Sequence, residues 1–272
     1  KRNLANSLFK NEYLEKINMI LAMNKFFGWK EILLLAIIIL AFFLRIYKLG
    51  EIPGSFNPDE VALGYNAYSI LKTGADEHGQ FLPLALKSFG DWKLPVYSYL
   101  AAISIAFFGF TEVAVRIPSA IAGVLGVFFI YGIALILFKK KGIALLASFF
   151  FALSPWGIYF SRGAYEVNVA TTIFLGGFLA LLYYFQKKEI RYLFLSFVLF
   201  GVTMFTQHNY IVFTPLYVFT ILFLFRKNIS YNRGWYGAIF LFVILIVVSY
   251  ASIIAGGGKK VSNLNIFNDR NV

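Results

Sequence analysis

Long apolar runs separated by short polar segments dominate the chain. Most runs are close to the roughly 20 residues that a helix needs to cross the hydrocarbon core of a bilayer, and they are too long for buried strands. Charged residues collect between the runs and not in their middles. We therefore predict helices over residues 31–47, 95–110, 118–138, 142–160, 167–186, 192–207, 210–225 and 235–255.

Composition identifies the class of protein that these helices build. The chain has 60% hydrophobic and 14% charged residues and a mean hydropathy of +0.72, whereas soluble domains have about 45–50% apolar and about 25% charged residues. The sequence therefore predicts an all-α integral membrane protein with about seven transmembrane helices. The absence of cysteine excludes disulfides and thiolate metal sites.

Segment 95–110 is short for a span, and Glu112 and Arg116 follow it at once. If it crossed the membrane, the Lys139–Lys141 turn would face away from the basic N-terminal segment. If it does not cross, the most basic segments share one side, as cytoplasmic loops do: 1–30, 139–141, 187–191 and 226–234. We therefore predict seven spans, a cytoplasmic N-terminus, and 95–110 as an outer surface or re-entrant helix.

This topology divides the chain into three parts. Residues 1–30 form a cytoplasmic basic segment, either an amphipathic interfacial helix or a disordered tail. Residues 31–255 form the membrane module, with a long first outer loop over 50–117 that holds a short surface helix over 59–72. Residues 256–272 are expected to be an outer segment leading to a C-terminal region missing from this sequence. The net charge of +12 is explained by cytoplasmic loops, so we expect no nucleic acid partner.

The polar candidates lie in the outer segments of this topology. A charge at the bilayer centre costs at least about 2.5 kcal/mol, and ion or proton carriers accept that cost to build a midplane pathway. No such pathway is visible, so we predict chemistry at the outer face of the membrane. The candidate residues are Asp59, Glu60, Asp91, Lys93, Arg116, Arg162, Glu166 and His208.

Several motifs occur in an order that resembles a known superfamily. They are Asp59-Glu60, Gly90-Asp91-Trp92-Lys93-Leu94-Pro95, Arg116-Ile117-Pro118-Ser119-Ala120, Leu153-Ser154-Pro155, and Ser161-Arg162 followed by Glu166. Together they resemble the protein O-mannosyltransferase and aminoarabinose-transferase superfamily, over roughly residues 45–215. The resemblance implies a type C membrane glycosyltransferase that uses a polyprenyl- or dolichyl-phosphate-linked sugar and inverts configuration at the anomeric carbon.

Sugar transfer from a lipid phosphate needs a base for the acceptor proton and cations for the departing phosphate. We predict Asp59 as the general base, with Glu60 beside it orienting the loop or the acceptor. Lys93 is the candidate phosphate contact. The other substrate-binding candidates are Asp91, Arg116, Arg162, Glu166 and His208, and Arg162 is the better of the two arginines because Glu166 follows it by four residues. Each has an ordinary structural alternative, such as a helix-starting acid, a snorkelling cation or an Arg162–Glu166 helical ion pair.

Three questions stay open at this stage. No cofactor is required by the predicted reaction, but a divalent cation on Asp59, Glu60, Asp91, Glu166 and His208 is an alternative that a chelator would test. The acceptor is a protein, a lipid or a cell-surface glycan. A transporter or flippase of lipid-linked sugars would share the basic outer pocket but should need a cavity reaching the inner face, and a non-catalytic membrane scaffold is the third functional class. In every case we expect a multi-pass protein of the plasma or inner membrane.

Overall fold

The computed structural model describes residues 28–88, 91–229 and 231–257. Its helices are α2 (Trp29–Ile46), α3 (Pro58–Thr73), α4 (Val96–Phe108), α5 (Glu112–Phe138), α6 (Lys141–Leu153), α7 (Pro155–Arg162), α8 (Glu166–Lys187), α9 (Ile190–Met204), α10 (Asn209–Leu224), the 3-10 helix η1 (Arg226–Asn228) and α11 (Arg233–Gly257). Two short antiparallel strands, β1 (Leu86–Ser88) and β2 (Asp91–Lys93), form a hairpin that the sequence did not predict. The predicted segments 1–30 and 256–272 lie almost wholly outside the described residues.

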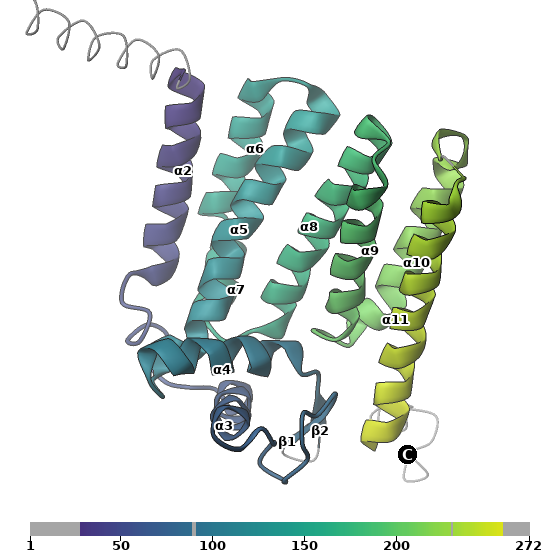
Figure 1. Cartoon of the computed structure of the whole chain (residues 1–272). Helices are drawn as coiled ribbons and strands as arrows, with labels where there is room; N and C mark the ends of the chain where they lie inside the picture. The colour runs from purple at the N-terminus through teal and green to yellow at the C-terminus, as the bar shows by residue number, and fades with distance from the viewer. Residues whose placement is uncertain (1–27, 89–90, 230, 258–272) are drawn as a thin grey trace, which may run out of the picture.

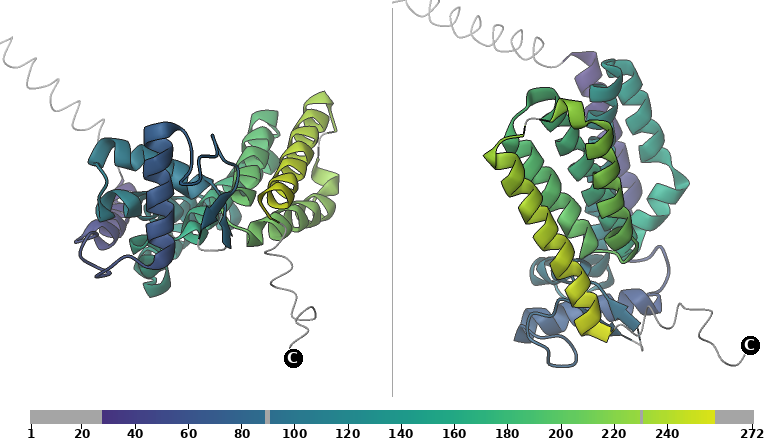
Figure 2. Two further views of the ribbon diagram at one scale, coloured as in Figure 1. Left: turned by 90° about the horizontal axis from the view of Figure 1, so that it is seen from below. Right: turned by 90° about the vertical axis from the view of Figure 1, so that its right-hand side faces the viewer.

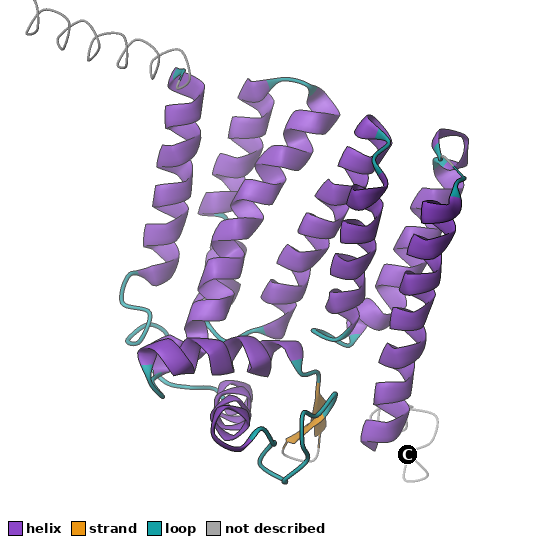
Figure 3. Cartoon of the chain, in the orientation of Figure 1, coloured by secondary structure: helices purple, strands orange, loops and turns teal. Residues whose placement is uncertain are grey.

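The helices form an upright bundle with a smaller layer across one end. Helices α2, α5, α6, α8, α9, α10 and α11 run roughly side by side, and α3, the hairpin and α4 lie below them (Figure 1, Figure 3). Within the described residues, α5, α8 and residues 233–252 of α11 are each long and apolar enough to cross a membrane, and the bent pair α6–α7 makes a fourth candidate. Three shorter apolar helices, α4, α9 and α10, accompany them. The predicted all-α integral membrane fold is confirmed.

Helix α4 does not run with the bundle. It has 13 residues, which span about 20 Å at 1.5 Å per residue and fall short of a 30 Å hydrocarbon core. It lies across the end of the bundle, next to α3 (Figure 2, seen from below). Gly109, with φ +74°, ends it in a backbone conformation that favours glycine. This orientation agrees with the predicted surface or re-entrant helix over 95–110.

The charged residues divide between the two ends of the bundle. One end, which we call the basic end, carries Lys30, Lys139, Lys140, Lys141, Lys187, Lys188, Arg191, Arg226, Lys227 and Arg233. The other, which we call the loop end, carries α3, the hairpin and α4, and with them Asp59 and Glu60 (Figure 1). The turns between α5 and α6, between α8 and α9 and between α10 and α11 all lie at the basic end. The lysines and arginines of these turns therefore gather there.

Two helix boundaries differ from the prediction. Helix α5 begins at Glu112, six positions before Pro118, because the Thr111 hydroxyl accepts a hydrogen bond from the Ala114 N–H (3.2 Å) and caps the first turn. The predicted helix 142–160 is broken between α6 and α7, which meet at 54°. Pro155 has no N–H to continue α6, and the Ser154 hydroxyl caps α7 through Gly157 N–H (3.3 Å).

A buried arginine joins three helices near the loop end. Arg45, in the last turn of α2, is fully buried. It donates to the carbonyls of Ala41 and Ala152 (both 3.1 Å) and to the Ser161 hydroxyl (3.3 Å). Gly123 of α5 lies against the same group, since a Cβ there would be 2.0 Å from Ser161 Oγ and 2.7 Å from Arg45 Nε. The missing side chain lets α5 approach α2 and α7.

Candidate active site

The first turn of α3 sends two adjacent carboxylates in different directions. Asn57 caps the helix by accepting from Glu60 N–H (2.8 Å), Pro58 occupies the first helical position, and the Glu60 carboxylate accepts in return from Asn57 N–H (3.1 Å). Successive residues of a helix are about 100° apart. Glu60 therefore turns inward and is 1% exposed, whereas the Asp59 side chain is 67% exposed.

The Glu60 carboxylate joins three parts of the chain. Its Oε1 accepts from Arg116 Nε (3.0 Å) and from the Ala164 backbone N–H (2.7 Å), and its Oε2 accepts from Arg116 Nη2 (3.2 Å). Buried charges are stable only when they are paired and hydrogen-bonded, and this carboxylate meets both conditions. The network fixes the start of α3 to α5 and to the turn between α7 and α8.

Arg116 and Arg162 donate hydrogen bonds to backbone carbonyls of the first loop and of α2. Arg116 donates to the carbonyls of Leu49 and Pro53 (both 3.0 Å) and Ser55 (3.1 Å). Arg162 donates to the carbonyls of Leu44 (2.9 Å), Tyr47 (2.7 Å), Lys48 (3.4 Å) and Ile52 (3.0 Å). These bonds satisfy carbonyls at the end of α2 and in the segment after it. Both arginines hold the first loop on the bundle.

The exposed carboxylate has a cation beside it. Lys93 Nζ lies 2.6 Å from Asp59 Oδ1, and the lysine side chain is only 10% exposed. Lys93 ends β2, and His208, before α10, holds that strand by donating from Nε2 to the Trp92 carbonyl (2.9 Å). The structure therefore brings Asp59, Lys93 and His208 to one region of the loop end. Asp91 begins the same strand and pairs with Ser88.

Glu166 stands in the first turn of α8. Arg162 ends α7, so the two residues stand on different helices and not four positions apart on one helix. Burial, and then the charges of Glu60 and Glu166, raise the pKa of Tyr97 well above its ordinary value. Tyr97 donates to the Val115 carbonyl (2.9 Å), so it stays a neutral donor at physiological pH.

Two further tyrosines lie where α7 turns into α8. The hydroxyls of Tyr159 and Tyr165 are 3.0 Å apart. This hydrogen bond, with burial and the nearby negative charges, raises the pKa of Tyr165 to about 12. Ala164, the residue before Tyr165, donates its backbone N–H to Glu60. The turn thus places the Tyr165 phenol close to the Glu60 carboxylate.

An apolar cavity of about 490 Å³ opens between α4, α5 and α8. It is lined by Leu100, Ile103, Ser104, Phe107, Phe108, Ile117, Pro118, Ile121, Ala122, Leu125, Phe129, Val169, Thr172, Ile173, Gly176 and Leu199. Helix α4 forms part of its wall and also packs on α3, which carries Asp59. A larger cavity, of about 960 Å³, lies at the basic end and has no part in this site.

The candidate metal ligands do not gather in the described residues. No group of three or more His, Asp or Glu side chains that could hold a metal ion occurs among them. Cations occupy the neighbouring positions instead: Lys93 contacts Asp59, and Arg116 contacts Glu60.

Sequence reasoning missed several residues of this network. The Ala164 N–H and Tyr97 carry no sequence signal of a site, because their partners lie elsewhere in the chain. Asn57 could have been found, since an Asn followed three residues later by Glu is a capping-box pattern. The position of Arg45 in the sequence could likewise have indicated its structural role. A cation at the end of an apolar run needs carbonyl or acidic partners, and this argument could have placed it in the core.

The bundle and its loop-end layer define a class, that of multi-span membrane proteins with the type C glycosyltransferase fold. The crystal structure of ArnT from Cupriavidus metallidurans in the apo state is similar, with a TM-score of 0.60 over 90% of this chain at 14% identity. Residues 93–251 match the model of the dolichyl-phosphate-mannose-protein mannosyltransferase family, and the chain belongs to that family. It spans 44% of the ArnT chain. No curated protein sequence matches it.

Proposed function

We propose that this chain carries the donor-sugar site of a membrane glycosyltransferase. The enzyme moves a sugar from a polyprenyl-phosphate carrier to an acceptor hydroxyl on a protein, a lipid or a glycan. The observation that carries the proposal is the exposed Asp59 carboxylate, fixed 2.6 Å from Lys93 on a helix that the buried Glu60–Arg116 pair anchors. Membership of the mannosyltransferase family supports the same reaction class.

Asp59 is the general base of the proposed reaction. The acceptor oxygen attacks the anomeric carbon while the bond from that carbon to the phosphate oxygen breaks. Asp59 takes the acceptor proton, the phosphate leaves with its negative charge, and a single displacement inverts the anomeric configuration. Asp59 suits this role because its carboxylate is accessible, whereas Glu60 is enclosed by four hydrogen bonds and serves as a positioning residue.

Lys93 is the phosphate contact. A salt bridge with a partner as exposed as Asp59 contributes only about 0–1 kcal/mol, so the negatively charged phosphodiester of the donor can draw the ammonium away at little cost. The ammonium would then stabilise the charge that develops on the leaving group. Arg116 and Arg162 hold carbonyls and Glu60 instead, and we assign them to loop positioning. Asp91 and Glu166 remain candidates for contacts with the sugar or acceptor.

The apolar cavity between α4, α5 and α8 is the proposed seat of the first isoprenoid units. Its lining is almost wholly hydrocarbon, and one polar side chain, Ser104, is buried there without a hydrogen-bond partner in the described structure. An uncharged hydrocarbon tail suits such a surface. The cavity shares α4 with the layer that carries the site, so the carrier's phosphate would emerge toward the loop end.

The loop end faces the outer side of the membrane in this proposal. The basic turns gather at the opposite end, and basic residues mark the cytoplasmic side of membrane proteins. The N-terminus is then cytoplasmic, and the membrane is the plasma or inner membrane. A reporter fused at position 78 in the first loop, and a second at 140, would test this orientation by their accessibility to impermeant reagents.

The test of the function is transfer of a labelled sugar from a synthetic polyprenyl phosphate in membranes that contain the protein. We expect Asp59→Asn to lower the rate by about 10²- to 10⁴-fold, the usual contribution of a general base. Glu77→Gln, another loop-end acid, is the matched control and should keep the wild-type rate. Transfer at the wild-type rate by Asp59→Asn would remove Asp59 from the role. Movement of lipid-linked sugar across the bilayer without transfer would instead indicate a flippase.

A further inference from the structure

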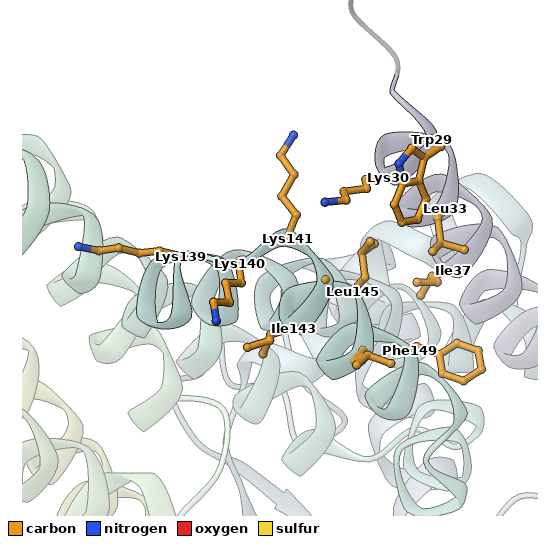
Figure 4. Close-up of a pocket in the computed structure, with 12 residues that line it drawn as sticks. Trp29, Lys30, Leu33, Ile37, Lys139, Lys140, Lys141, Ile143, Leu145 and Phe149 are labelled. Carbon is orange, nitrogen blue, oxygen red and sulfur yellow. The ribbon is translucent and has the colours of Figure 1, made fainter.

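The cavity of about 960 Å³ at the basic end lies between the first turns of α2 and α6. Its walls are apolar and come from Leu33 and Ile37 of α2 and from Leu145, Leu146 and Phe149 of α6. Its mouth is cationic and aromatic, with Trp29, Lys30 and Lys139–Lys141 (Figure 4). We call this feature the α2–α6 groove. The proposed transfer reaction at the loop end does not use it.

Two helices begin at the mouth of the groove. Helix α2 begins at Trp29 and α6 at Lys141, and neither has a side-chain cap on its free N–H groups. The first turn of a helix therefore offers N–H donors and the positive end of the dipole to an anion. The lysines add full positive charges at the same place. Both features favour a phosphate group.

The charges around the mouth are unevenly balanced. Lys141 is paired with Glu31, and Lys30 lies over the ring of Trp29, 5.3 Å from its centroid. No carboxylate of the described residues lies within salt-bridge distance of Lys139 or Lys140. Figure 4 shows Lys30 reaching from α2 toward α6, while Lys139 extends away from the groove. Glu31 therefore balances only one of the lysines at the mouth, and the mouth keeps a net positive charge.

The groove runs along the helix axes below this charge. From Trp29 to Ile37, and from Lys141 to Phe149, each wall descends eight positions, about 12 Å at 1.5 Å per residue. The wall residues are partly exposed, with Leu146 57% and Leu33 41% exposed. A ligand that fits this groove has a phosphate at the cationic mouth and a hydrocarbon chain between the apolar walls, as a phospholipid does. A free phosphate or an acidic peptide would leave the apolar walls uncovered.

We propose that the α2–α6 groove is a binding site for an anionic glycerophospholipid. The phosphate lies at the mouth, near Lys30, Lys140 and the starts of α2 and α6. One acyl chain lies between Leu33 of α2 and Leu146 of α6. The ring of Trp29 lies at the level of the headgroup, as indole rings do at membrane interfaces. The site would fix α2 against α6 at the end of the bundle opposite the sugar site.

Native mass spectrometry of the detergent-purified full chain tests the site, with dioleoyl phosphatidylglycerol as the probe and dioleoyl phosphatidylcholine as the neutral lipid. We expect Lys30→Gln/Lys140→Gln to weaken phosphatidylglycerol binding by roughly tenfold to thirtyfold, since each lysine near an anionic headgroup contributes about 1 kcal/mol. The charge-matched control is Lys187→Gln/Lys227→Gln, two exposed lysines of other basic-end turns, which should bind as the wild type does.

A second pair of variants tests the groove itself. Leu146→Trp places a large ring in the acyl channel and should weaken binding without changing charge. Leu137→Trp, at an exposed basic-end position outside the groove, is its control. Equal loss in both lysine pairs would mean diffuse surface attraction and would overturn the proposal. Unchanged binding in the Lys30/Lys140 and Leu146 variants would overturn it too, and would leave the groove to another part of the chain or a second copy.

Discussion

Glu60 and Arg116 meet 56 positions apart in the chain, with both side chains almost completely removed from solvent. Nε and Nη2 of the guanidinium lie 3.0 and 3.2 Å from the two carboxylate oxygens. The guanidinium also lies over the ring of Phe56, 5.2 Å from its centroid. The pair connects the first turn of α3 to α5. Because Asp59 is in the same turn, the pair also sets where the proposed base stands.

Glu60→Gln should lower the free energy of unfolding by about 3–5 kcal/mol, because it leaves the buried Arg116 charge without its counter-ion. Thermal unfolding in detergent, followed by intrinsic fluorescence, measures the loss. Asp59→Asn is the matched control, since an exposed substitution usually changes stability by about 0.5 kcal/mol or less. Equal stability of Glu60→Gln and the wild type would show that the pair does not anchor α3.

Lys93→Gln should weaken binding of a sugar-free polyprenyl phosphate by about tenfold to a hundredfold, the value of a charge-assisted hydrogen bond. The dissociation constant can be measured by titration of the purified protein. Lys87→Gln is the control, because Lys87 is exposed on the neighbouring strand, opposite Trp92. If both variants bind the lipid as the wild type does, Lys93 is only a partner of Asp59.

Ile121→Trp should fill the apolar cavity beside α4 and discriminate carriers by tail length. Ile121 lines that cavity and is 48% exposed, so the larger ring can enter it without disturbing the core. We expect about tenfold weaker binding of a long polyprenyl phosphate and little change for a phosphate with a single isoprenoid unit. Phe128→Trp, equally exposed on α5 but outside the cavity, serves for comparison. Equal affinity for both tail lengths would place the tail elsewhere.

Gly123→Ala should destabilise the bundle by about 1–3 kcal/mol, as overpacking of a tight interface does. The new methyl would lie 2.0 Å from Ser161 Oγ, so α5 must move away from α7 or the serine must rotate. Gly142→Ala is a clean comparison, because nothing lies within 4 Å of a Cβ at that position, and alanine favours the helix. A Gly123→Ala protein with the wild-type melting temperature would show that the helices separate freely.

The sequence by itself determined the class of protein, the helices and the division of charge. Apolar runs of span length can satisfy their backbone groups in lipid only as helices, and segment 95–110 was predicted as a surface helix from its length and from the charge of the later loops. The motif order led to the family that the comparisons confirm. These features depend on local composition, spacing and charge, which are all present in the linear chain.

Only the tertiary structure decided what each charged side chain does. Asp59 and Glu60 are chemically alike and adjacent, yet one is exposed beside Lys93, 34 positions away, and the other is buried against Arg116 and the Ala164 N–H, 104 positions away. Arg116 and Arg162, predicted as substrate-binding residues, hold backbone carbonyls. Burial and hydrogen-bond partners come from segments that meet only on folding, so the local pattern could name the candidate residues but could not separate their roles.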